Sequence, residues 1–358
     1  MQERILLHDG AHAATGLSNL PGDEKSWLQS DPGTKTCTAA PQSAFGVDTE
    51  GVVVDPRDSS FWLADEYRPS ILHVAPDGQI LARIVPIDLS SPNLPTATQY
   101  ASALSAQGGS LTVQPAFPAI VNGFRKNRGF EGIAASPDGR WLYTALQSPM
   151  DFKDGWAGAS PPVSISNTDR NLARNSPYIR VFRIDVADPS APVVDREWIY
   201  LLSRGFSSAV PDKISDVQWA APDVLLIQER DDDRPTAITN FYRADFSAAT
   251  NLLDPSNAEA YALAAKTTVP TLEMTTSVPA FITPALTSPT PAIDLDQLLS
   301  VAGFVNSKVE GFATVRAHGS NPALYAAVND NDFDLDHTVL PTAFPDSIPT
   351  QVDIFAQP

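Results

Sequence analysis

The sequence is poor in the residues that build cysteine and histidine metal sites. Its 358 residues include one cysteine, Cys37, and five histidines. A single cysteine excludes an intramolecular disulfide framework and a cysteine-based zinc site. The histidines form no His-Glu-x-x-His pattern, and no Gly-x-Ser-x-Gly occurs, which argues against a zinc hydrolase and against a serine nucleophile. We therefore expect any chemistry to rest on carboxylates, amides and basic side chains.

Basic residues are scarce relative to acidic ones. Lys and Arg number 24 against 42 Asp and Glu, which gives a formal net charge of −18. Such a field repels a polyphosphate backbone, so we expect no nucleic-acid partner, whereas a divalent cation is favoured. No run approaches the roughly 20 apolar residues of a membrane span, and residues 1–8 lack the apolar core of a signal peptide. If the protein is exported, we expect its signal to have been removed from this sequence.

The chain is rich in β-strand patterns. Hydrophobic residues make up 43% and charged residues 18%, which is typical of a globular chain, and 32 prolines favour short strands joined by loops. Residues 52–54 and 61–64 are predicted to form an antiparallel hairpin. Residues 70–75 and 79–85 form a second one around Asp77-Gly78. Four consecutive strands from about 50 to 86 have the size of one propeller blade.

The first hairpin recurs along the chain. Glu50 and Glu66 are 16 positions apart, and so are Glu131 and Gln147. The acids that begin the four copies are Glu50, Glu131, Asp216 and Glu310. Their separations of 81, 85 and 94 residues hold either one blade with an insertion or nearly two blades. We predict a single all-β domain over residues 1–358, a β-propeller of about five to seven blades with insertions near 87–122, 150–176 and 247–305.

Inner-strand residues of a propeller converge on its axis, so the repeated acids are expected to meet there. The predicted metal ligands are Glu50, Glu131, Asp216, Glu229, Glu310 and Asn329. Calcium suits such a set, because it accepts six to eight oxygen ligands. The alternative is structural: a Glu-Gly pair at a strand start can simply cap backbone groups at a bulge.

Basic residues flank the acids in each copy: Arg68, Arg128, Arg230 and Lys308. If these basic residues surround the same end of the propeller channel, they could hold an anionic group against a cation, as in phosphate sites. The alternative for each is a local salt bridge with its neighbouring acid. Asp65 and Glu66, at the end of the first hairpin, are the predicted catalytic acids.

These motifs together resemble the phytase-like, "esterase-like activity of phytase" family of bacterial β-propeller proteins. The likeness is carried by residues 48–51, 61–67, 127–132, Ser215-Asp216 with Glu229-Arg230, and 308–311, and it covers roughly 47–330. The resemblance implies a propeller, calcium dependence, and export to the periplasm or cell exterior.

The leading hypothesis is a calcium-dependent phosphoesterase that acts on a small anionic substrate. In it, Glu66 orients or deprotonates water while Arg128, Arg230 and Lys308 bind the phosphate. One alternative is a lactonase or carboxylesterase that uses the same cation to polarise a carbonyl. The other is a non-catalytic propeller in which calcium is structural.

Overall fold

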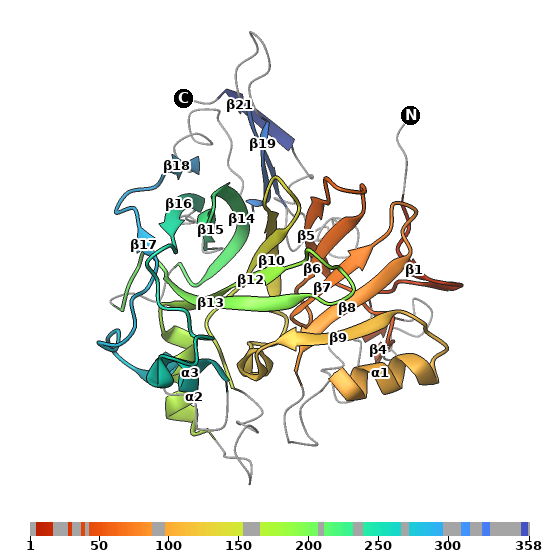
Figure 1. Ribbon diagram of the computed structural model, residues 1–358, viewed down its shortest axis with the longest axis horizontal. Coiled ribbons are helices and arrows are strands. Elements are labelled where there is room, and N and C mark those ends of the chain that lie inside the picture. Colours follow the sequence, from red (N-terminus) through yellow and green to blue (C-terminus); the bar gives the residue numbers. More distant parts are fainter. Residues whose placement is uncertain are drawn as a thin grey trace.

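The protein is built mainly of β-strands. The computed structural model describes residues 5–16, 28–30, 37–39, 43–87, 97–152, 165–206, 211–231, 239–265, 272–295, 309–315, 324–329 and 352–356. Within these ranges only three short α-helices accompany the strands, so the predicted all-β class is confirmed. Four larger sheets and two small two-stranded ones make up the fold (Figure 1).

The first larger sheet follows the predicted unit closely. It contains β5 (Thr49–Val54), β6 (Phe61–Asp65), β7 (Ser70–Val74) and β8 (Ile80–Pro86), joined antiparallel, and then β9 (Thr112–Phe117), parallel to β8. The turn between β7 and β8 contains Gly78 at φ +96°, a conformation that glycine adopts without steric cost. The predicted Asp77-Gly78 turn is therefore confirmed.

Three further sheets repeat this plan along the chain. The second contains β10 (Phe130–Ala135), β11 (Trp141–Leu146), β12 (Tyr178–Asp185) and β13 (Val193–Leu201). The third contains β14 (Lys213–Ala221), β15 (Val224–Arg230), β16 (Thr239–Asp245), β17 (Leu286–Thr287) and β18 (Ile293–Asp294). The fourth contains β19 (Val309–Val315), β20 (Leu324–Asn329) and β21 (Val352–Ala356).

The first strands of these sheets, which we call the inner strands, lie side by side in the order β5, β10, β14, β19 (Figure 1). Glycine permits the close approach. A Cβ on Gly51 would lie 2.7 Å from the carbonyl oxygen of Glu131, and one on Gly132 would lie 2.6 Å from the backbone nitrogen of Val217. The inner strands therefore carry their side chains into one shared region.

Apolar side chains fill the spaces between successive sheets. The rings of Phe117 and Phe130 pack at a tilt between the first and second sheets, with their centroids 4.7 Å apart, and Trp62 and Phe182 belong to the same cluster. Phe241 and Phe312 meet at 4.3 Å between the third and fourth. Burying such aromatic surfaces is the main term that holds neighbouring sheets together.

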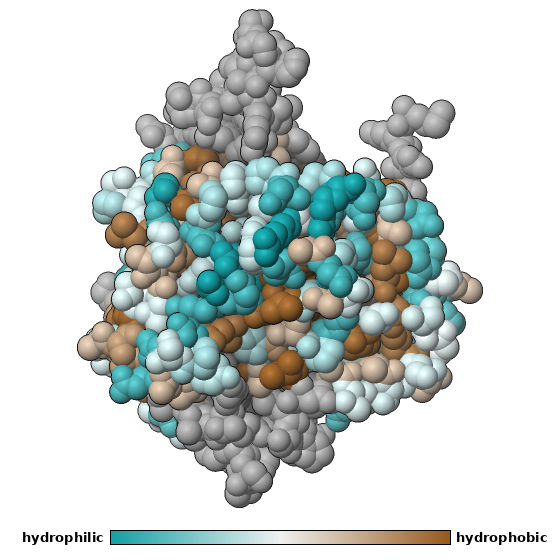
Figure 2. Space-filling view, in the orientation of Figure 1, coloured by the Kyte–Doolittle hydropathy of each residue, from teal (hydrophilic) through white to brown (hydrophobic). Residues whose placement is uncertain are grey.

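The predicted insertions contain the helices. The first holds α1 (Ala97–Ala106) and the 3₁₀ turn η1 (Ala119–Gly123), the second α2 (Asn167–Asn175), and the third α3 (Ala258–Ala265) and η2 (Leu272–Met274). No helix in the described ranges is long and apolar enough to cross a membrane. Figure 2 shows polar residues over the upper part of one face and apolar ones below them.

The N-terminal segment pairs locally and with the first sheet. β1 (His8–Asp9) pairs with β2 (His12–Ala13), and His8 bridges to Gln79 beside β8. The partner of β21 is β20. The two remaining short strands, β3 (Leu28–Ser30) and β4 (Cys37–Ala39), pair with each other.

Candidate functional site

Each inner strand carries a β-bulge near its start. The register skips one residue between Thr49 and Gly51, between Ile214 and Asp216, and between Val309 and Gly311, and it shifts likewise after Phe130. The residues at the bulges are Glu50, Glu131, Ser215 and Glu310. A bulge re-aims a side chain and is common beside active sites.

The register corrects the sequence alignment of the third copy. Ser215, and not Asp216, stands at the place of Glu50, while Asp216 stands at the place of Gly51. Asp216 accepts hydrogen bonds from the backbone nitrogen of Val217 at 2.8 Å and from that of Phe312, on β19, at 3.2 Å. It therefore joins two inner strands. Burial raises its pKa to about 7, partly opposed by a hydrogen bond from Gln218 and by these two from the backbone.

Further polar residues lie at the ends of the second strands of the first three sheets. They are Glu66 directly after β6, Gln147 directly after β11, and Arg230, the last residue of β15. Gln147 Nε2 donates to Glu66 Oε1 at 2.6 Å and also to Glu131. The side-chain amide of Gln147 thus links the second sheet to the first by a hydrogen bond.

Arg230 continues this network toward the fourth sheet. It is 2% exposed, and its Nη2 pairs with Glu310 and lies 3.6 Å from Glu131 Oε1. Its Nε donates to Ser215 Oγ at 2.5 Å. Glu66, Gln147, Glu131, Arg230 and Glu310 therefore form one connected chain, which we call the axial network.

Three carboxylates stand together at one end of the axial network. Asp48, Glu50 and Glu66 each offer an oxygen, and these oxygens lie within 4.8 Å of one another. Asp48 and Glu66 are half-buried, and Glu50 is exposed. An oxygen-only set of this kind fits a hard divalent cation such as calcium. Asp48 was not predicted, although its two-residue spacing from Glu50 could have indicated it, since such residues share a face of extended chain.

The electrostatics of the cluster favour a positive ligand or a proton. Burial raises the pKa of Glu66 to about 7, and Asp48 and Glu310 raise it further, against the opposing hydrogen bond from Gln147 and the charge of Arg128. Burial, then Glu66 and Glu310, raise the pKa of Glu131 well above its usual range. Neighbouring carboxylates repel, so a cation would stabilise their ionised forms.

Two buried polar atoms in this region have no hydrogen-bond partner among the described residues. One is the carbonyl oxygen of Gln147, whose side chain is 3% exposed, and the other is Nη1 of Arg128. Buried polar atoms normally have a partner, because leaving one unpaired is costly. An acceptor and a donor are thus available for a cation and an anion.

Arginines gather next to Glu66: the charge of Arg128 acts both on Glu66 and on Arg125. Arg125 pairs with Asp212 at 3.5 Å. Burial lowers the pKa of Arg125, and the positive charges of Arg128 and Arg174 lower it further. Guanidinium groups that repel one another are suited to an anionic group placed between them.

Two predicted site acids have partners elsewhere. Asp65 is fully buried and ion-paired with Arg83, and burial raises its pKa to about 6. It also accepts from the backbone nitrogen of Arg68 at 3.2 Å, so it holds the segment that carries Glu66. Glu229 accepts from Tyr200 Oη at 2.5 Å and from Ser203 Oγ at 2.5 Å. Both acids therefore stand outside the axial network and support it.

The remaining predicted residues fall in different places. Arg68 lines a pocket behind Glu66. Asn329 ends β20 opposite Val309, and its side chain lies outside the described residues, as does all of Lys308. The structure thus brings together Glu50, Glu66, Glu131, Arg230 and Glu310 from the predicted set, with Arg128 next to them.

Two comparisons with known proteins are short or distant. An "Uncharacterized secreted protein" of Arthroderma benhamiae is 31% identical over 112 residues, which are 31% of this chain and 21% of that protein. The match therefore spans about a fifth of that relative's length. Kuenenia stuttgartiensis hydrazine synthase aligns over 92% of this chain and 82% of its own, with 12% identity and a TM-score of 0.29. A score this low supports no statement about fold or function.

A family comparison covers almost the whole sequence. The family described as "Phytase-like: Esterase-like activity of phytase" matches residues 4–333. This range includes all the inner strands and every described residue of the axial network. The chain therefore belongs to the phytase-like family.

Proposed function

We propose that the protein is a calcium-dependent hydrolase of phosphate esters, with its site at the axial network. The observation that carries this proposal is the group formed by Asp48, Glu50 and Glu66 beside the unpaired oxygen of Gln147. Membership of the phytase-like family supports a hydrolase. The order of the inner strands supports a β-propeller around that site.

Asp48, Glu50 and Glu66 would hold the calcium ion, and Glu131 and Glu310 would add negative charge behind it. A bound divalent cation polarises a phosphoryl oxygen and lowers the pKa of bound water. The site residues fit this role because burial, and after it mutual repulsion, raises the pKa values of Glu66 and Glu131, and a bound cation relieves the repulsion.

Glu66 is the proposed general base. Burial raises its pKa to about 7 in the metal-free protein, and a cation beside it would lower that value, so Glu66 would be ionised at neutral pH and able to accept a proton. It would accept the proton of the attacking water as the ester P–O bond breaks, and would return it to the departing alkoxide. Gln147 and Asn127, whose amide nitrogens lie 2.6 and 3.4 Å from the Glu66 oxygens, orient its carboxylate.

Arg128 is the proposed phosphate ligand. Its Nη1 is buried without a partner in the described structure, and its charge acts on both Glu66 and Arg125. A guanidinium can hold two phosphate oxygens at once. Arg230, which pairs with Glu310, is better placed to keep the buried acids apart than to bind substrate.

The test is phosphate release from a panel of phosphomonoesters, measured with calcium and with a chelator. The proposal predicts turnover that needs the metal. Absence of metal-dependent phosphate release across the panel would overturn it. Carboxylic esters and lactones belong in the same panel, because the family description names an esterase-like activity. For the compartment, we propose export, as the name of the fungal relative records secretion of that protein.

A further inference from the structure

A cleft lies between the N-terminal segment and the inner strand of the first sheet. Ile5 and Leu7 form one wall of the cleft, and residues of β5 and β6 form the other. The cleft has a volume of about 300 Å³ and is open to solvent. This volume reaches the lower end of the range for sites that bind small molecules. The cleft is therefore large enough to take an organic group.

The lining of the cleft is mainly apolar. Val52 on β5 pairs with Leu63 on β6, so their side chains share one face of the first sheet. Leu63 is buried in a core cluster against which Leu7 and Phe61 pack. Val52 is 61% exposed, and Ile5 on the opposite wall is 40% exposed. Exposed apolar side chains on both walls favour an apolar occupant, because it would remove them from water.

The cleft reaches the carboxylate cluster at Glu50. This residue lines the cleft, and its carboxylate offers one of the three oxygens that lie within 4.8 Å of one another, with those of Asp48 and Glu66. The lining residues of β5 run from Thr49 to Val52, roughly 10 Å of extended chain. A cation held by the three carboxylates would thus stand beside an elongated, mainly apolar cleft.

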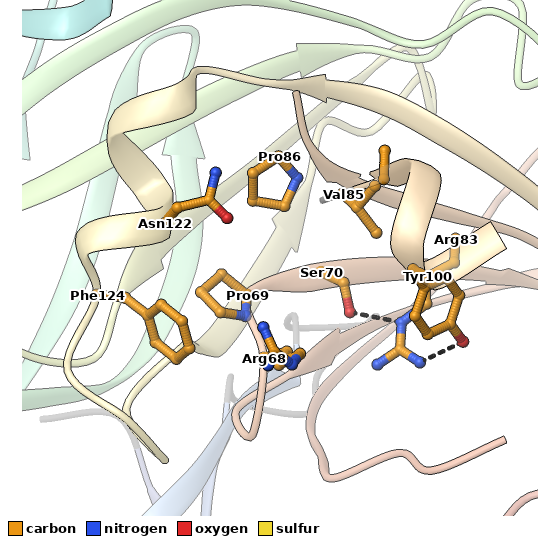
Figure 3. Close-up of a pocket in the computed structure, with 10 residues that line it drawn as sticks. Arg68, Pro69, Ser70, Arg83, Val85, Pro86, Tyr100, Asn122 and Phe124 are labelled. Atoms are coloured by element: carbon orange, nitrogen blue, oxygen red, sulfur yellow. Dashed lines mark hydrogen bonds between the residues drawn. The ribbon is translucent and has the colours of Figure 1, made fainter. Parts of the chain in front are cut away.

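A smaller hollow behind the segment that carries Glu66 offers no comparable space (Figure 3). Its volume is about 30 Å³, enough for about one or two water molecules. In its wall, Arg83 donates from Nε to Ser70 at 2.8 Å and from Nη1 to Tyr100 at 2.7 Å (Figure 3). These polar groups are therefore bonded to one another, and an organic group belongs in the cleft at Glu50.

We infer that the cleft at Glu50 binds an apolar chain of the substrate, joined to the phosphate that the cation holds. The preferred substrates are then phosphate monoesters of linear alcohols of medium length, such as hexyl phosphate. Polyhydroxylated phosphates are disfavoured, because their hydroxyl groups would lose water without gaining hydrogen bonds from the apolar walls. This inference rests on the proposed function for the position of the phosphate.

Direct binding separates the cleft from catalysis. Hexylphosphonate and methylphosphonate share a head group whose P–C bond resists hydrolysis, and hexanol shares only the chain. Each probe is titrated by calorimetry into the full chain in the presence of calcium. Burial of the chain should make hexylphosphonate bind about tenfold or more tightly than methylphosphonate. The head group should likewise make hexylphosphonate bind more tightly than hexanol.

Two pairs of variants locate the chain. Val52→Trp places a ring in the cleft and should remove the advantage of hexylphosphonate while leaving methylphosphonate affinity unchanged. Its matched control is Val193→Trp, at a valine of β13 that is 56% exposed. Ile5→Ser covers the case in which Val52→Trp fails to fold, and it should weaken hexylphosphonate alone. Its control is Leu6→Ser, at the exposed neighbour outside the lining. Both controls should behave as wild type.

Equal affinities of wild type for hexylphosphonate and methylphosphonate would overturn the inference, as would equal effects of each variant and its control. Hexanol that binds as tightly as hexylphosphonate would overturn it too, because the chain would then bind without the head group. Hexylphosphonate binding that Val52→Trp removes, in a protein without any phosphatase turnover, would keep the cleft and overturn the proposed function. Turnover with the same kcat/KM for hexyl phosphate and methyl phosphate would do the reverse.

Discussion

Gln147 donates a hydrogen bond from the second sheet to Glu66 of the first, with 2.6 Å between Nε2 and Oε1. The same nitrogen donates to Glu131, so one amide stands between two carboxylates whose pKa values are both raised. The two sheets share their polar residues at this point. Adjacent sheets are therefore joined by hydrogen bonds between polar side chains as well as by apolar packing.

Removal of the Gln147 amide should increase the electrostatic repulsion between the carboxylates of Glu66 and Glu131. Gln147→Leu keeps the approximate volume but leaves Glu66 and Glu131 without their common donor. The cost is expected to be about 1–3 kcal/mol of unfolding free energy at pH 7.5. Chemical denaturation with a chelator present measures it. If the loss is no smaller at pH 5, where the two acids are protonated more fully, the carboxylates are not its source.

Glu66 and Asp65 are neighbours in sequence with different expected roles. Glu66→Gln should lower the rate of phosphate release by about 10²- to 10⁴-fold without loss of folding, as expected for a general base. Asp65→Asn leaves Arg83 as an unpaired buried charge and should instead cost about 3 kcal/mol or more of stability.

The check is the rate per folded molecule together with the thermal midpoint for both variants. Asp65→Asn, assayed well below its midpoint, should retain activity within about threefold. A large loss of rate in Asp65→Asn, together with an unchanged midpoint, would instead assign the chemistry to Asp65.

Stability in the absence of metal should fall as the pH rises. Glu66 and Asp216 have native pKa values of about 7, against ordinary values of 4.5 and 3.8, so the native state binds their protons more tightly than the unfolded chain does. Their contribution is fully present below about pH 4 and is lost as the pH rises through 7. With a chelator, the thermal midpoint should therefore decrease from pH 5 to pH 8.

Calcium should reverse this decrease at pH 8, because a ligand that binds only the native state stabilises it. Glu66→Gln should make the pH dependence shallower. Asp55, whose pKa of about 2 reflects hydrogen bonds with Arg57 and Trp62 that outweigh its burial, acts in the opposite sense only below about pH 4. A midpoint that rises between pH 5 and pH 8 in chelator would contradict the assignment.

Asp216 tests the register directly. Asp216→Asn should leave calcium affinity within about twofold of wild type and change the thermal midpoint by only a few degrees. Asn keeps one acceptor oxygen but loses the one that accepts from Phe312 and Gln218. Glu50 occupies the bulge position in the first sheet that Ser215 occupies in the third. Glu50→Gln should weaken calcium binding about tenfold or more. Similar losses of affinity in both variants would restore Asp216 as a ligand.

Much of the fold could be predicted from local patterns. Alternating apolar residues and Asp77-Gly78 define a hairpin within a few residues, because turn geometry and burial act locally. The equal spacing of Glu50–Glu66 and Glu131–Gln147 correctly grouped the acids of two sheets. Blade number stays a prediction, since insertions and blades have similar lengths.

The site was less predictable, because partners come from distant positions. Asp65 meets Arg83 from β8, and Glu229 meets Tyr200 from another sheet. Nothing in the short motif around either acid indicates that its charge is satisfied inside the protein. The bulge at Ser215 was equally hidden, since a serine followed by an aspartate resembles a displaced Glu-Gly. Such shifts of one residue depend on pairing across strands and not on the strand alone.

The central claim is that Asp48, Glu50 and Glu66 hold a calcium ion. Calorimetric titration of calcium into metal-free protein at pH 7.5, for wild type and for Asp48→Asn, tests it most directly. The account predicts a saturable site in wild type and an affinity at least about tenfold lower in Asp48→Asn. Identical calcium affinity in the two proteins, or no saturable binding to wild type, would contradict it.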